Sequence, residues 1–128
     1  MAEKGRITPD KAITLLNIAT NLDSTNANLY FQKYELLDIK ANNLKPAIRN
    51  TQYAIRKQQL HLLKTCINLC PSWPAYHLFY ALTLNKFSQR PNIMTQQQIL
   101  SELKKAAELK PYSELYSKIY KRYLKTYK

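Results

Sequence analysis

Residues 58–86 read QQLHLLKTCINLCPSWPAYHLFYALTLNK, and this stretch predicts two short helices joined by a tight turn. Its first half carries apolar residues at three- and four-residue spacing, which is typical of one buried helical face. Pro71 ends that helix, because proline lacks a backbone N–H and clashes with the preceding turn. Pro74 stands at the start of the second helix, where a missing N–H costs nothing. A hairpin of this kind needs similar neighbours to bury its apolar faces.

The chain supplies such neighbours, because the turn pattern occurs three times. Each copy has a small residue, then Leu, then a helix-breaking residue, then a large apolar residue, always at the same spacing. The copies are Ala19-x-x-Leu22-x-Ser24 before Leu29, Cys66-x-x-Leu69-x-Pro71 before Tyr76, and Ala106-x-x-Leu109-x-Pro111 before Tyr116. Their separation falls in the range of roughly 20–50 residues that marks helical repeat arrays.

We therefore expect an all-α protein: an α-α superhelix of about three antiparallel helix pairs with a C-terminal capping helix. A single glycine and the absence of alternating Val, Ile and Thr runs leave little material for a sheet. Residues 1–7 are expected to be a disordered lead, and they lack the apolar segment of a signal peptide. No apolar run is long enough to span a membrane.

Three helix boundaries rest on specific signals. Thr8 is expected to cap the first helix ahead of Pro9. A long third helix is expected from Pro46 to Leu69, with a kink allowed near Gln58 and Gln59. The fifth helix is expected to begin at Thr95, which with Gln98 has the spacing of a capping box.

Charge is the second informative feature of the sequence. The formal net charge is +12, and no carboxylate occurs between Ile39 and Ser101. On a helical projection of the third helix, Lys45, Arg49 and Arg56 lie within roughly 40° of one another. The basic contact face that we expect is Lys45, Arg49, Arg56 and Lys57. It is interpreted as the contact for an acidic protein or peptide, with a solvated face, nucleic acid, and anionic lipid or polysaccharide as alternatives.

The last helix is strongly two-sided. Its aromatic face is Tyr112, Tyr116, Tyr120, Tyr123 and Tyr127, and its basic face is Lys118, Lys121, Arg122, Lys125 and Lys128. This pattern predicts an amphipathic cap whose tyrosines are half buried at the rim of the core. The alternative is a partner-binding or membrane-surface helix.

Residues that could carry out chemistry are few. Cys66 and Cys70 share one helix at a spacing that matches no structural zinc pattern and suits a disulfide poorly. His61 and His77 have no nucleophile or carboxylate near them in the sequence. We therefore expect no enzyme, no metal and no cofactor.

The repeated turn resembles the tetratricopeptide repeat (TPR), whose second helix carries small, bulky and small residues before a proline. The matching residues are Ala12, Leu16 and Ala19 before Ser24, Leu63 and Cys66 before Pro71, and Leu103 and Ala106 before Pro111. The likeness covers most of the chain, so it implies a single TPR-like domain over residues 1–128. It also implies a scaffold that binds proteins without catalysis.

Three segments look like small bacterial TPR-like proteins associated with envelope exopolysaccharide biosynthesis. They are GRITPDKAITLLNIATNLDSTNANLY, LLKTCINLCPSWPAYHLFYALTLNK and LKKAAELKPYSELY. Proteins of that type usually place a membrane helix before the module. The likeness implies an adaptor in a polysaccharide assembly or export complex, located in the cytoplasm or attached to the membrane and facing the periplasm.

The expected mechanism is binding in a concave groove lined by the first helix of each pair. The groove residues that we predict are Tyr30, Tyr34, Tyr76, His77 and Tyr80. The alternatives are RNA or other nucleic acid on the basic residues between 40 and 90, and an anionic membrane surface on the C-terminal helix.

Overall fold

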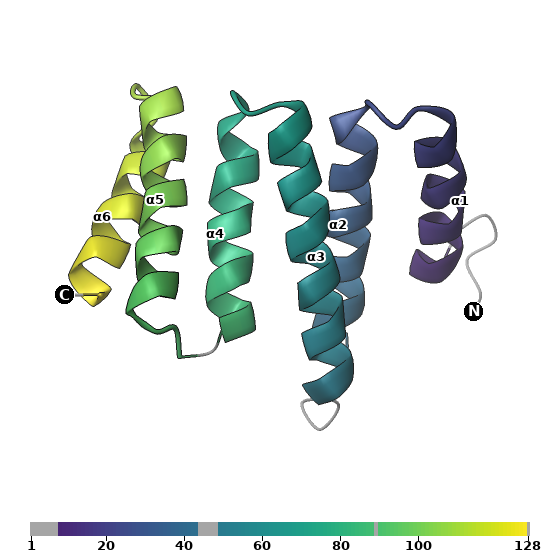
Figure 1. Ribbon diagram of the computed structural model, residues 1–128, viewed down its shortest axis with the longest axis horizontal. Helices are drawn as coiled ribbons and strands as arrows, with labels where there is room; N and C mark the ends of the chain where they lie inside the picture. Colours follow the sequence, from purple (N-terminus) through teal and green to yellow (C-terminus); the bar gives the residue numbers. More distant parts are fainter. Residues whose placement is uncertain (1–7, 44–48, 89, 128) are drawn as a thin grey trace, which may run out of the picture.

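The computed structural model describes residues 8–43, 49–88 and 90–127, and all regular structure in these ranges is α-helical. The helices are α1 (Pro9–Leu22), α2 (Ala27–Asn42), α3 (Arg49–Leu69), α4 (Pro74–Ser88), α5 (Ile93–Leu109) and α6 (Glu114–Thr126). They run up and down in sequence order, from α1 at one end of the molecule to α6 at the other (Figure 1). Each helix packs on the next one, which confirms the predicted all-α architecture of consecutive helix pairs. The expected disordered lead, residues 1–7, lies outside the described ranges.

The three repeated patterns form equivalent turns. The first helix of each pair ends at the Leu of its pattern, and residues 23–26, 70–73 and 110–113 connect it to the second helix. In the first two turns the amide after the helix donates to the carbonyl of the small residue, at 2.9 Å for Ala19 and 2.8 Å for Cys66. The repeated spacing in the sequence therefore corresponds to a helix end followed by a four-residue turn at all three places.

Short polar side chains begin α1, α2 and α5 by accepting hydrogen bonds from free backbone amides. Thr8 accepts from the amide of Lys11 at 3.3 Å, which confirms the predicted cap of α1. The predicted capping box of α5 is wrong, because Asn92 accepts from the amide of Thr95 at 2.8 Å and starts the helix at Ile93. Gln98 instead donates to the hydroxyl of Tyr80 at 3.4 Å.

The long helix α3 is continuous through Gln58 and Gln59 to Leu69, while the predicted start at Pro46 lies outside the described residues. Gln59 is fully buried, and its amide group finds partners beyond the helix backbone. Its nitrogen donates to the carbonyl of Tyr34 at 3.1 Å, and its oxygen accepts from Arg56 at 2.8 Å. Both polar atoms are satisfied, so this glutamine joins α3 to α2 without interrupting the helix.

The core consists of two main clusters of buried side chains. One, between α2 and α3, contains Leu37, Ala41, Ile55 and Leu62. The other, between α4 and α5, contains Leu78, Ala81, Leu84, Ile99, Leu103 and Ala106. Cys66 and Ala106, the small residues of the second and third turns, are completely buried, whereas Ala19 is only partly buried. The first repeat is thus less enclosed than the other two.

Helix α6 covers the second cluster with its aromatic side, as a capping helix should. Four of the five tyrosines named above pack there, and the hydroxyl of Tyr127 donates to Asn85 at 2.6 Å. Tyr112 is the exception at 99 % exposure, because α6 begins at Glu114 and leaves it in the turn. Among the described residues, no helix combines the length and the apolar character needed to cross a membrane.

Candidate functional site

A groove lined by aromatic rings runs between α2 and α4. It consists of two hollows, of about 240 and 550 Å³, that share Phe31. The smaller hollow is lined by Phe31, Tyr34, Glu35, Asp38, Ile39 and Phe79. The larger one, near the turns, is lined by Thr25, Asn26, Ala27, Asn28, Phe31, Cys70, Trp73 and Tyr76. We call these two hollows together the aromatic groove.

Phe31 is the centre of the groove floor. Its ring centroid lies 5.4 Å from that of Tyr34, 5.4 Å from that of Tyr76 and 5.6 Å from that of Phe79. These separations are those of favourable aromatic pairs. The rings come from two helices that are not neighbours in sequence, so side-chain packing, rather than the backbone path, joins α2 to α4. The floor is a preformed aromatic surface.

The floor is apolar and its acidic rim is partly neutralised. Burial raises the pKa of both Tyr34 and Tyr76, so their phenols stay neutral. Burial alone would raise the pKa of Asp38, but hydrogen bonds from Arg56 and Gln59 outweigh it and lower that pKa. The Arg56 guanidinium lies 2.5 Å from the Asp38 carboxylate and compensates its charge.

Two of the five predicted groove residues line the aromatic groove, and three do not. Tyr34 and Tyr76 contribute to its floor. Tyr30 instead donates to the carbonyl of Ser24 at 3.0 Å, and Tyr80 accepts from Gln98 of α5. His77 is buried and lies 2.7 Å from both Glu102 and the carbonyl of Pro71.

The groove also lies on the second helices of the pairs, α2 and α4, and not on the first helices as the sequence had led us to expect. The reason is that aromatic side chains of α2 and α4 contact each other directly. The ring of Phe31 lies against those of Tyr76 and Phe79, and the ring of Tyr34 lies against that of Phe79.

The structure describes two side chains of the predicted basic contact face, those of Arg56 and Lys57. Lys45 and the side chain of Arg49 lie outside what the structure describes. Arg56 is engaged within the fold by Asp38, Gln59 and Asn42, so it is a packing residue and not the open contact that was expected. Lys57 is exposed.

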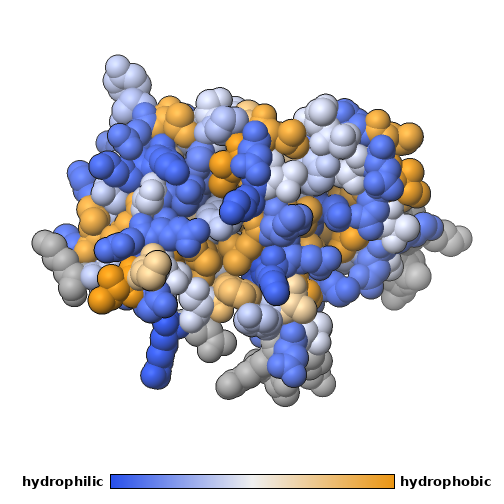
Figure 2. Space-filling model, viewed as in Figure 1, coloured by the Kyte–Doolittle hydropathy of each residue, from blue (hydrophilic) through white to orange (hydrophobic). Residues whose placement is uncertain are grey.

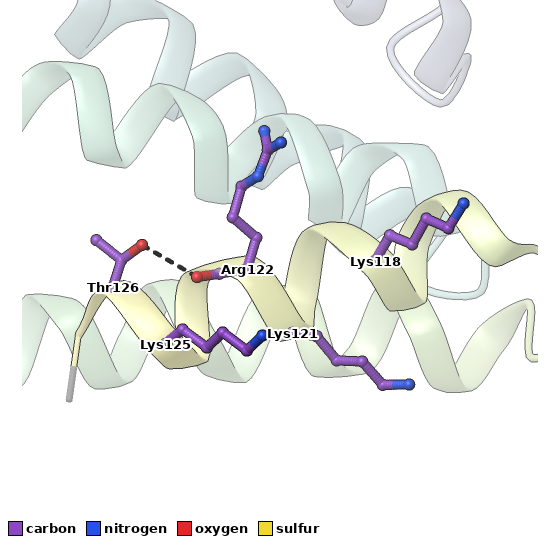
Figure 3. Close-up of a pocket in the computed structure, with 5 residues that line it drawn as sticks. All are labelled: Lys118, Lys121, Arg122, Lys125 and Thr126. Atoms are coloured by element: carbon purple, nitrogen blue, oxygen red, sulfur yellow. Dashed lines mark hydrogen bonds between the residues drawn. The ribbon is translucent and has the colours of Figure 1, made fainter.

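An open cationic surface is present on the outer side of α6. Lys118, Lys121, Arg122 and Lys125, with Thr126, line a shallow hollow of about 410 Å³. Figure 3 shows these side chains projecting from successive turns of the helix. One of these cations, Lys118, forms an exposed ion pair with Glu114 of the same helix, at 3.6 Å. The surface matches the basic face predicted for the last helix.

Sequence reasoning missed Phe31, Trp73 and Phe79 as site residues because it selected tyrosines. A signal was available in the spacing. Phe31 stands three residues before Tyr34, and Phe79 stands three residues after Tyr76, so each pair shares one helical side. Aromatic pairs at this spacing on two helices indicate a common surface.

The groove presents aromatic rings, side-chain amides and hydroxyls, together with the carboxylates of Glu35 and Asp38 and the thiol of Cys70. Within residues 8–43, 49–88 and 90–127, no cluster of three or more His, Cys, Asp or Glu side chains could hold a metal ion. Both ring nitrogens of His77 are already occupied by hydrogen bonds inside the fold. Comparison of the chain with protein-family models and with curated proteins finds no match.

Proposed function

We propose that this protein is a non-catalytic interaction module that binds a segment of a partner protein in the aromatic groove. The observation that carries this proposal is Trp73, which is 56 % exposed at the mouth of a hollow whose floor is Phe31 and Tyr76. Tryptophan and tyrosine are the residues that most often dominate binding energy at protein interfaces. Asn26 and Asn28 at the rim can bond to the backbone of a bound segment.

The groove favours a partner segment with an apolar anchor residue, and the positive charge of the rest of the molecule favours a partner with negative charge. The hollow of about 550 Å³ has room for a large side chain of the partner. The net charge of +12 and the cationic side of α6 attract acidic proteins and speed their encounter. The expected ligand is therefore an acidic segment with an aromatic or large aliphatic residue. The likeness to exopolysaccharide-associated TPR-like proteins supports an adaptor role in a polysaccharide assembly or export complex.

Trp73 is the single tryptophan of the chain, so its fluorescence reports on the groove directly. The probe is a library of random twelve-residue peptides displayed on phage and selected on the full chain. We expect the selected peptides to share an aromatic or aliphatic anchor among acidic residues and to shift the Trp73 emission to shorter wavelength. Trp73→Ser should weaken binding at least tenfold.

Ile93→Ser is the matched control, because Ile93 is also exposed and lies on α5, away from the groove. It should leave binding of the selected peptides unchanged. Peptides that bind the Trp73→Ser variant as tightly as the parent, or that leave the Trp73 emission unaltered, would contradict a role for the groove.

A second candidate function, the binding of a polyanion, is favoured by the cationic surface of α6. The tyrosine side of α6 is already packed on the core, whereas the basic side is open to a ligand. Single-stranded RNA and anionic vesicles are the probes, each measured at two salt concentrations. Binding that falls steeply with salt and is lost in Lys121→Glu plus Lys125→Glu, but kept in Lys57→Glu, supports this function. Absence of retention on both probes at physiological salt rejects it.

A further inference from the structure

Helix α1 exposes a stripe of apolar side chains at one end of the molecule. Leu15 is 48 % exposed, Ile18 54 % and Leu22 84 %, and their spacing places them on one side of the helix. Figure 2 shows hydrophobic side chains along the outer edge at this end. Among the described residues, α1 packs mainly on α2. The stripe therefore has no covering helix in this structure.

The repeat register shows what this stripe corresponds to. Aligning Ala19 with Cys66 and Ala106 pairs Leu15 with Leu62 of α3 and Glu102 of α5. Leu62 is only 6 % exposed, because it packs in a cluster with Leu37 and Ala41 of α2. Glu102 bonds to His77 of α4. In both repeats this position faces the preceding helix.

Two neighbouring positions behave in the same way. Ala12 corresponds to Gln59, which is fully buried and donates to a carbonyl of α2. Ala19 corresponds to Cys66, which is fully buried with its sulfur 3.5 Å from the carbonyl of Ala27 on α2. In α1, by contrast, both alanines are only partly buried. Ala12, Leu15 and Ala19 are thus less enclosed on α1 than the equivalent residues of α3.

We propose that α1 is a docking site for an acidic amphipathic helix of a partner protein. This helix would pack on α1 as α2 packs on α3 and as α4 packs on α5, extending an interface that the fold already uses twice. Its apolar residues cover Leu15, and the small side chains of Ala12 and Ala19 allow close approach. Ile18 lies at the edge of this contact, because its equivalents in the other repeats, Thr65 and Lys105, are only partly buried or exposed. This site is separate from the aromatic groove.

Charge identifies the occupant as an acidic partner and not a second copy of this chain. Lys11 lies within the apolar stripe and is exposed. Its counterpart in α5, Gln98, reaches Tyr80 of the preceding helix, so Lys11 would contact the docked helix. Two copies meeting through α1 would bring two Lys11 ammonium groups and two net charges of +12 together, which opposes association. An acidic side chain beside Lys11 reverses that effect.

Two synthetic peptides based on residues 27–42 test the proposal, because α2 carries the contacts that cover α3. One peptide is made acidic by Lys33→Glu and Lys40→Glu, and the other is made basic by Glu35→Lys and Asp38→Lys. We expect calorimetry with the full chain to show the acidic peptide binding at least tenfold more tightly than the basic one.

Variants of the full chain then locate the site. Leu15→Gln plus Ile18→Gln should weaken binding of the acidic peptide at least tenfold, and Lys11→Glu should remove the preference for it. Ile93→Gln plus Met94→Gln, at two still more exposed apolar positions on α5, is the control and should change nothing. Trp73→Ser should also have no effect, so this proposal and the groove proposal fail separately.

Three results would overturn the proposal. The first is absence of binding by both peptides, and the second is unchanged binding in the Leu15→Gln plus Ile18→Gln variant. The third is a dimer of the parent protein in sedimentation equilibrium that this double variant abolishes, because it would assign α1 to a second copy. Circular dichroism should confirm that the variants keep the parent helix content, as expected for substitutions of exposed residues.

Discussion

The ring nitrogen Nδ1 of His77 on α4 lies 2.7 Å from the carboxylate of Glu102 on α5. The other ring nitrogen lies 2.7 Å from the carbonyl oxygen of Pro71, which can only accept a hydrogen bond. Both side chains are largely removed from solvent. One imidazole therefore ties together α4, α5 and the turn that carries Trp73 at the mouth of the aromatic groove.

Loss of either partner in this pair should destabilise the fold, because the other polar group stays buried without compensation. We expect His77→Ala and Glu102→Ala each to lower the free energy of unfolding by about 3 kcal/mol. Urea denaturation followed by circular dichroism measures the change. Lys105→Ala removes the exposed partner of Glu102, at 3.4 Å, and should cost less than about 0.5 kcal/mol. Equal effects of all three variants would contradict the role of burial.

Arg56 should matter for stability and its neighbour Lys57 should not. Arg56→Met leaves Asp38 and Gln59 without their partner inside the fold, and we expect a loss of about 2 kcal/mol. Lys57→Met, at an exposed position of the same helix, should stay within about 0.5 kcal/mol of the parent. Thermal denaturation of the two variants side by side provides the measurement.

The lowered pKa of Asp38 adds a pH dependence with a definite sign. The carboxylate stabilises the folded state at pH values above its ordinary pKa of 3.8. That contribution is lost as the pH falls through the lower value of the folded protein. The free energy of unfolding of the parent should therefore decrease below about pH 4, and Asp38→Asn should show a smaller decrease. Identical acid profiles would exclude Asp38 as a source of the effect.

The two cysteines should differ sharply in reactivity. Burial raises the pKa of the Cys66 thiol to about 12, so it stays protonated at neutral pH, and its side chain is inaccessible. Cys70 is partly exposed and lines the aromatic groove. Iodoacetamide at pH 8, followed by peptide mass spectrometry, should modify Cys70 alone until urea unfolds the protein. A bound groove ligand should protect Cys70, and modification of Cys66 in the folded protein would contradict its burial.

Alkaline pH should destabilise the protein through its buried phenols. Burial raises the pKa of Tyr34, Tyr76, Tyr80 and Tyr127 above the ordinary 10.0. Their contribution to stability is complete below that value and is lost as the pH rises through the raised values of the folded state. Burial lowers the pKa of Lys33, so this one group acts in the opposite direction to the four phenols. The free energy of unfolding should thus be smaller at pH 11 than at pH 9.

Tyr34→Phe tests the source of this alkaline loss. The variant removes one phenol that must stay neutral in the folded state, so the decrease between pH 9 and pH 11 should become smaller. An unchanged decrease would place the effect elsewhere in the chain.

The helices could be predicted from the sequence because their signals are local. The helix starts are marked by Pro9 and Pro74, and the helix ends by the one Leu that precedes each of the three turns. These residues act within one or two turns of helix, so their spacing in the sequence was enough to place the helices. The start of α5 was misplaced for the same reason. Asn92 and Thr95 both offer capping oxygens, and only the three-dimensional path of the chain decides between them.

The candidate site could be predicted only in part, because it depends on contacts between helices. Arg56 was taken as free, yet its partner Asp38 stands on the preceding helix, just outside the interval that lacks carboxylates. Tyr34 was placed correctly, whereas Tyr30 on the same helix faces a turn and bonds to it. Which side of α2 meets α4 is set by tertiary packing, and the spacing of one helix does not contain that information.

The far end of the row of helices has the opposite character to α1. In the repeat register, Lys121 of α6 takes the position that Tyr34 has in α2 and Ala81 has in α4. Those two residues are buried, whereas Lys121 is exposed beside Lys118 and Lys125. Seating the apolar end of one molecule on this end of another would strip water from several ammonium groups, at a large cost in free energy. Contact between the apolar side of α1 in one molecule and the basic side of α6 in another is therefore disfavoured.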